Sequence, residues 1–200
     1  PTSNYNSWLF VSYPSIFSIG WGENGIISLF NPKIQDWYRP FIAHELGHFY
    51  FGTYKVFNSE LGDMMSEGFA EFLSFELTNE LIGTDVYTKK IYDKIKALEG
   101  NEPTPIGKVK GISDYDYREF YVYYYTPIIL TAIKNEIGEE KMWKWLNTIL
   151  RTEAEFTNYD FFISTLRTTL NDQKLTEHIE KQYLTNNNSL KNAIDKINVE

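Results

Sequence analysis

The sequence predicts an α+β domain in which a small strand-rich lobe precedes a mainly helical lobe. Short apolar runs at residues 8–11 and 25–30, bounded by Asn, Pro and Gly, are typical of strands. From about residue 36 onward, apolar residues recur with the period of a helix, in segments separated by glycines. Strands followed by a run of helices is the element order of an α+β fold.

The helical part divides into segments with recognisable ends. Asp63 and Asn158 are good helix-capping residues, and Trp143 lies on the predicted apolar face of its segment. The expected helices are about 36–51, 63–81, 84–98, a segment that ends before Gly138, 139–152, 158–170 and 174–184. A Gly- and Pro-rich loop should occupy residues 99–113. We expect residues 1–185 to form one domain and residues 186–200 a linker or a weak terminal helix.

Composition excludes several classes of function. The 200 residues carry a formal net charge of -8, which argues against the basic surface that binds nucleic acids. Cysteine is absent, so neither thiolate metal sites nor disulfides are possible. No apolar run reaches the roughly 20 residues of a membrane span. The chain starts at Pro1 without an initiator Met, so we expect it to be a piece of a longer protein.

Two of the three histidines form the motif His44-Glu45-Leu46-Gly47-His48. Four residues apart on a helix, both imidazoles project from one face and can bind the same ion. Zinc favours imidazole ligands, and the glutamate after the first histidine is placed to take a proton from water. The alternative is a helix that carries two histidines by chance beside a solvated glutamate.

Glu67 is the candidate third ligand. Eighteen residues separate it from His48, and it lies on the next predicted helix, which a loop at residues 58–62 would fold back against the first. Glu71, one turn later, could accept a hydrogen bond from a ligand histidine or could simply be solvated. The sequence therefore predicts one zinc ion per chain, bound by His44, His48 and Glu67.

These motifs resemble the gluzincin zinc metallopeptidases, specifically the aminopeptidase N family, which includes leukotriene A4 hydrolase. The spacing from the second histidine to Glu67, in a Glu-Gly-Phe-Ala context, is that of this family and not that of thermolysin. The resemblance implies a thermolysin-like catalytic domain, with Glu45 as the base that activates water on zinc. It also implies flanking domains that this chain lacks.

The resemblance extends to a candidate substrate-binding residue. Residues 20–24 read Gly-Trp-Gly-Glu-Asn and are similar to the family's Gly-x-Met-Glu-Asn stretch, with Gly22 at the Met position. The resemblance implies that Glu23 binds the free α-amine of a peptide substrate. The alternative is an exposed acid beside the Asn24-Gly25 pair, which is a strong hairpin signal.

A catalytic tyrosine follows from the same resemblance. The family places it a fixed distance before a turn that residues 137–140, Ile-Gly-Glu-Glu, match, and that distance leads to Tyr123. Helical periodicity independently places Tyr123 on one stripe with Leu130 and Ile133. The resemblance implies that Tyr123 stabilises the oxyanion, whereas the alternative is that this tyrosine-rich run only packs.

The sequence thus predicts a zinc-dependent aminopeptidase that acts on peptides with a free N-terminus. Two alternatives remain open. One is a gluzincin endopeptidase in which Glu23 is only structural, and the other is a zinc-holding but inactive peptide-binding module. The presence of Glu45 favours an enzyme, because a purely structural zinc site needs no base.

Overall fold

The computed structural model describes residues 9–12, 20–23, 26–29 and 38–197. The predicted turn at Asn24-Gly25 lies outside the described residues. The C-terminal residues 198–200 also lie outside them.

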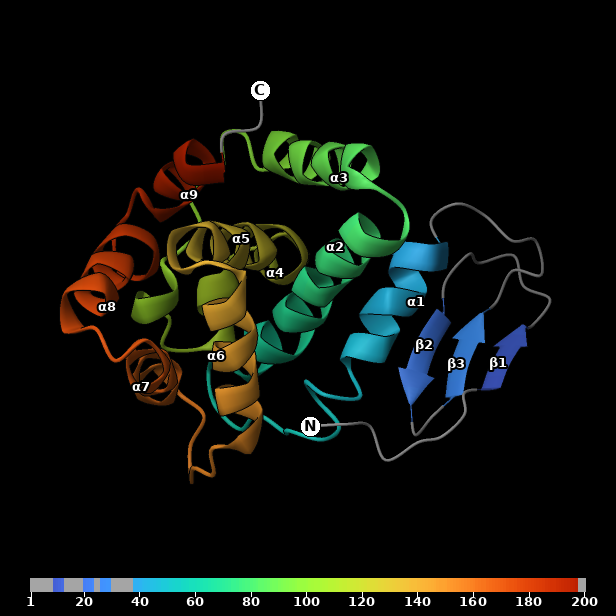
Figure 1. Ribbon diagram of the computed structural model, residues 1–200, viewed down its shortest axis with the longest axis horizontal. Coiled ribbons are helices and arrows are strands. Elements are labelled where there is room, and N and C mark those ends of the chain that lie inside the picture. The colour runs from blue at the N-terminus through green and yellow to red at the C-terminus, as the bar shows by residue number, and fades with distance from the viewer. Residues whose placement is uncertain (1–8, 13–19, 24–25, 30–37, 198–200) are drawn as a thin grey trace.

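The N-terminal part contributes a three-stranded sheet of β1 (Leu9–Ser12), β2 (Gly20–Glu23) and β3 (Ile26–Leu29). The strand order is β1-β3-β2, with β3 parallel to β1 and antiparallel to β2. Figure 1 shows the sheet at one side of the molecule, with β2 beside the helix α1 (Tyr38–Gly47). The candidate amine anchor Glu23 therefore ends the strand that lies nearest to the motif helix.

The prediction of an α+β, thermolysin-like domain with a strand-rich lobe is wrong. From residue 38 to residue 197 the ordered elements are helices, and the strands of the described residues are only four residues long each. Within the described residues, the apolar runs that predicted a lobe yield this small sheet, and the fold is mainly helical.

The helical body holds the hydrophobic core of the described residues. In chain order its elements after α1 are η1 (Met64–Gly68), α2 (Phe69–Leu81), α3 (Thr84–Ala97), η2 (Ile106–Lys108), η3 (Ile112–Tyr115), α4 (Arg118–Phe120), η4 (Tyr121–Tyr125), α5 (Thr126–Ile137), α6 (Glu139–Arg151), α7 (Tyr159–Leu170), α8 (Gln173–Ile179), η5 (Glu180–Leu184) and α9 (Ser189–Ile197). The segments η1, η4 and η5 are π-helical. None of the helices in the described part of the chain combines the length and the apolar character that a membrane crossing requires.

A close approach of backbones positions α1 against α2. A Cβ atom at Gly47 would lie 2.9 Å from the Cα atom of Ala70, closer than real contacts allow. Ser74 of α2 also donates a hydrogen bond of 2.8 Å to the carbonyl of Pro40 in α1. Glycine at position 47 therefore lets the motif helix lie directly on the helix that follows Glu67 (Figure 1).

The two π-helical segments η1 and η4 meet where α2 and α5 begin. A Cβ atom at Gly68 would lie 2.4 Å from Cγ2 of Thr126, so only glycine fits at this contact. Pro127 has no N–H and cannot donate the α-helical hydrogen bond to the carbonyl of Tyr123, four residues earlier. That carbonyl instead accepts a hydrogen bond of 2.7 Å from Nζ of Lys94 in α3. Glu67 lies in η1 and Tyr123 in η4, so both residues are part of π-helical turns. Such turns are frequent at functional sites.

The end of the described chain packs onto the helical body. In α9, Ser189 and Ala193 are buried, and Oγ of Ser189 lies 2.7 Å from the hydroxyl of Tyr125. Figure 1 shows α9 beside α5. Residues 189–197 are thus part of the folded body.

Candidate metal centre

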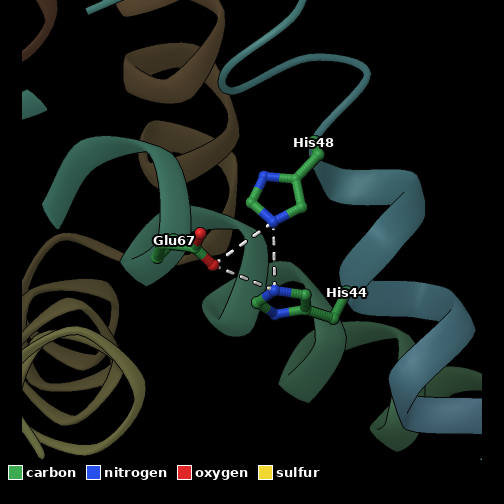
Figure 2. A group of neighbouring side chains, drawn as sticks. All are labelled: His44, His48 and Glu67. Atoms are coloured by element: carbon green, nitrogen blue, oxygen red, sulfur yellow. Dashed lines mark hydrogen bonds and ion pairs between the residues drawn. The ribbon is translucent and has the colours of Figure 1, made fainter. Parts of the chain in front are cut away.

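His44, His48 and Glu67 come together between α1 and η1. One potential ligand atom from each of these residues lies within 4.8 Å of the others. Nε2 of His44 and Nε2 of His48 are 3.1 Å apart, and each is 3.3 Å from Oε2 of Glu67. Figure 2 shows the His44 ring projecting from α1, and the His48 ring from just beyond its end, toward the Glu67 carboxylate. The structure therefore juxtaposes the three residues that the sequence singles out.

Hydrogen bonds on the far sides of both rings fix their orientation. Nδ1 of His44 lies 3.0 Å from a carboxylate oxygen of Glu71, and Nδ1 of His48 lies 3.2 Å from the carbonyl oxygen of Phe51. Both partners can only accept, so each Nδ1 carries the hydrogen and donates it. In a neutral imidazole, Nε2 then presents a lone pair. Two Nε2 lone pairs and a carboxylate oxygen thus converge on one point.

Converging lone pairs repel one another unless a positive charge lies among them. Burial by itself lowers the pKa of His44, but hydrogen bonds to Glu67 and Glu71 outweigh it and raise the pKa to about 9. Burial would raise the pKa of Glu67, but its hydrogen bonds with His44 and His48 hold that pKa well below its ordinary range. The cluster therefore attracts a cation, which can be a proton or a metal ion.

The chemistry of the donor set fits zinc. Zinc is bound in proteins by imidazole nitrogen and carboxylate oxygen, and catalytic zinc sites use three protein ligands and keep one position open. A ligand histidine commonly donates its second N–H to a carboxylate or a backbone carbonyl, and both histidines have such a partner here. The suggestion that Glu71 supports a histidine is confirmed by the 3.0 Å contact.

Glu71 also binds two partly buried lysines that the sequence analysis did not single out. Its Oε1 lies 2.8 Å from Nζ of Lys94 and 3.3 Å from Nζ of Lys90, both in α3. Burial would raise the pKa of Glu71, but the hydrogen bond with His44 and the charges of the two lysines hold it well below its ordinary range. Glu71 therefore stays ionised and holds α1, α2 and α3 together.

Tyr123 reaches the cluster from η4. Its hydroxyl donates a hydrogen bond of 3.0 Å to Oε2 of Glu67, the same oxygen that faces both histidines. Burial and the nearby charge of Glu67 raise the pKa of Tyr123 to about 12, so the phenol keeps its proton at neutral pH. The guanidinium of Arg118 lies 5.9 Å from the centroid of the Tyr123 ring and 2.6 Å from Oδ1 of Asp63.

Glu45 faces a pocket next to the cluster. The pocket has a volume of about 470 Å³, and its lining includes His44, Glu45, Glu71 and Tyr123. Glu45 is only 7% exposed, so most of this residue is shielded from solvent. The candidate base and the candidate oxyanion donor therefore share one cavity with a candidate metal ligand.

Two further residues complete the placement of the predicted site. Glu23 is the last residue of β2, and its backbone pairs with Ile26 of β3. The described part of the structure includes the backbone of Glu23 but not its side chain. His178, the third histidine, lies 3.4 Å from Glu136 and takes no part in the cluster.

Comparison with known proteins finds similar folds among solved structures and no similar sequences. No protein-family model matches the chain, and no curated protein matches its sequence. Several solved structures do match its fold, and all those reported below are M1 zinc metallopeptidases. The shared feature is the fold.

The matching structures are much longer than this chain. One is a variant of an M1 zinc metallopeptidase from Deinococcus radiodurans bound to a Tyr-Ser-Ala substrate, with a TM-score of 0.68 and 16% identity over 86% of this chain. The same organism's unmodified enzyme gives a TM-score of 0.68 at 14% identity. A two-domain M1 variant bound to L-arginine gives 0.67 at 16%. The chain spans 38% of the length of each.

The raised pKa of His44 predicts a pH-dependent zinc affinity. In the metal-free protein the proton on His44 stabilises the fold fully below its ordinary pKa of 6.5, and that contribution is lost as the pH rises through about 9. Zinc must displace this proton, so its apparent affinity should rise roughly tenfold per pH unit from pH 7 to 9. Titration against a competing chelator measures this slope. His178→Gln is the matched control and should keep it, and a flat profile would contradict the assignment.

Proposed function

We propose that this chain is the catalytic domain of a zinc-dependent aminopeptidase, with His44, His48 and Glu67 as the zinc ligands. The observation that carries the proposal is the convergence of two Nε2 lone pairs and one carboxylate oxygen within 3.3 Å of one another. Glu45 and Tyr123 lie around the same cavity, as a hydrolytic site requires. The similarity of the fold to M1 zinc metallopeptidases supports the same conclusion.

A bound zinc ion would polarise the scissile carbonyl and lower the pKa of a water molecule. Glu45 would take a proton from the attacking water and later pass it to the leaving amine, as a base that becomes an acid. Its burial beside His44 supports this role, because a proton carrier must stay within reach of both groups. A carboxylate such as that of Glu45 suits both steps, because it can accept a proton and then return it.

Tyr123 would donate a hydrogen bond to the carbonyl oxygen as negative charge develops on it. The raised pKa supports this role, because a phenol that stays protonated remains a donor. Its hydroxyl already lies 3.0 Å from Oε2 of Glu67, so it is within reach of a group bound at the same point. The contact of Lys94 with the Tyr123 carbonyl would hold this part of the chain in place.

Glu23 would bind the α-ammonium of the substrate and make the enzyme an exopeptidase. Its position at the end of β2, the strand beside α1, supports this proposal. A carboxylate there favours a free N-terminus, because a blocked peptide would leave the acid desolvated and unpaired. The endopeptidase and the inactive peptide-binding module are the competing functions, and the tests below separate them.

We further propose that residues 1–185 form the catalytic domain of a longer protein. The structural match covers 86% of this chain but only 38% of the M1 structure. Domains beyond this chain would then help to close the substrate site.

Two variants should separate zinc binding from proton transfer. Glu67→Ala removes a ligand and should lose most of the zinc, since two remaining ligands bind it weakly. Glu45→Gln keeps the shape but cannot take a proton, so zinc should stay while peptidase turnover falls at least ~10²-fold. Metal analysis and a peptide-hydrolysis assay measure both effects. Full zinc occupancy in Glu67→Ala, or near-normal turnover in Glu45→Gln, would refute the assigned roles.

Blocked substrates should distinguish an aminopeptidase from an endopeptidase. The protein should cleave a peptide with a free N-terminus at least ~10-fold faster than its N-acetylated form, because only the free amine can pair with Glu23. Glu23→Ala should keep its zinc and lose this preference. Equal cleavage of both peptides would favour the endopeptidase, and zinc binding without any hydrolysis would favour the inactive module.

A further inference from the structure

The pocket beside His44, His48 and Glu67 has two positively charged residues in its wall. Besides Glu45 and Tyr123, its lining includes Lys90 and Lys94 of α3. Both lysine side chains are largely buried, with 18% and 15% of their surface exposed. Lysine is rarely buried without a matching negative charge.

Among the residues that the structure describes, one carboxylate pairs with both of these lysines. Oε1 of Glu71 is the acidic partner of Lys90 at 3.3 Å and of Lys94 at 2.8 Å. The other hydrogen bonds of the two ammonium groups go to uncharged atoms, namely Oγ of Ser74 and the carbonyl of Tyr123. Two positive charges and one negative charge leave a surplus of one positive charge at this wall.

The remaining acids around the pocket do not cancel that surplus. Glu119 is exposed at the protein surface, where water screens its charge. Glu45, in the proposed function, faces the positive charge of the metal. The pKa of Lys90 is lowered, mainly by burial and also by the charge of Lys94, in spite of the opposing effect of Glu71. An anion that enters the pocket would therefore lie near Lys90, whose ammonium shares its carboxylate partner with Lys94 and otherwise contacts Oγ of Ser74 and the ring of Phe75.

The position of Glu45 indicates which part of a peptide enters this pocket. Glu45 must pass a proton to the leaving amine, so the residue that carries this amine must lie next to the Glu45 carboxylate. The α-amine of the substrate, by contrast, would be held at Glu23 on the β2 side of α1. The pocket that contains Glu45 therefore lies on the leaving-group side of the scissile bond.

We propose that this pocket binds the residue that follows the scissile bond and selects for a carboxylate there, with Lys90 as the residue that determines the preference. The carboxylate can be an Asp or Glu side chain, or the terminal carboxylate of a dipeptide. A volume of about 470 Å³ is sufficient for one amino-acid residue. The inference rests on the proposed function, because it assigns the pocket to one side of the cleaved bond.

Binding of four peptides tests the proposal without relying on turnover. Leu-Glu-amide is compared with Leu-Gln-amide for the side chain, and Leu-Leu with Leu-Leu-amide for the terminal carboxylate. Calorimetric titration into the zinc-loaded Glu45→Gln protein measures each Kd. In at least one pair, the peptide with the carboxylate should bind at least ~10-fold more tightly, the usual effect of a charged hydrogen bond. The pair that responds identifies the source of the carboxylate.

Variants of α3 identify the residue responsible. Lys90→Met removes the charge and keeps the apolar stem, so the two peptides of the responding pair should bind with about equal Kd values. Lys90→Arg keeps a positive charge and should retain the preference. Lys89→Met is the matched control, because Lys89 is exposed and pairs with Asp93 on the same helix. Lys89→Met should keep the full preference. Thermal unfolding of each variant verifies that it is folded.

The proposal is overturned if neither pair of peptides shows a preference, or if the preference survives in Lys90→Met. The same peptides are also compared by their kcat/KM values in the unaltered protein, in which residue 45 is a glutamate and not a glutamine. If the unaltered protein cleaves none of the peptides, the proposed function fails, while the ratio of Kd values still decides the charge preference of the pocket.

Discussion

The contact of α1 with α2 at Gly47 is the constraint on which the site depends. Because a side chain at this position would collide with the backbone of Ala70, the two helices can lie this close only with glycine. The close approach brings His44 within 3.3 Å of Glu67 and within 3.0 Å of Glu71. The packing of α1 on α2 and the geometry of the cluster of His44, His48 and Glu67 therefore depend on the same contact.

Charge links this pair of helices to the rest of the fold. Glu71 contacts a candidate ligand on one side and two lysines of α3 on the other. Lys94 then continues to the Tyr123 carbonyl, which lacks its helical donor because residue 127 is proline. A buried ionised network of this kind is costly if it is only partly satisfied, so it favours one arrangement of these helices. The same network places Lys90 and Lys94 on the wall of the neighbouring pocket.

The cluster could be predicted from sequence because its information is local. The spacing within residues 44–48 fixes one helix face, and the Asn158 cap is confirmed by its hydrogen bond to the Phe161 amide. Two other predictions were wrong because contacts between distant parts of the chain decide which partner or environment a side chain has. Asp63 makes no cap and binds Arg118 instead, and Trp143 is 39% exposed. The lysines of α3 could not be predicted, because only the packing of α3 against α2 brings them to Glu71.

Anomalous diffraction at the zinc absorption edge, from crystals of the zinc-loaded protein, tests directly whether His44, His48 and Glu67 bind one zinc ion. If they do, a single strong peak should lie about 2.0–2.2 Å from Nε2 of both histidines and from a carboxylate oxygen of Glu67. A peak at other residues, or no peak in this cluster, would refute zinc binding by these three residues.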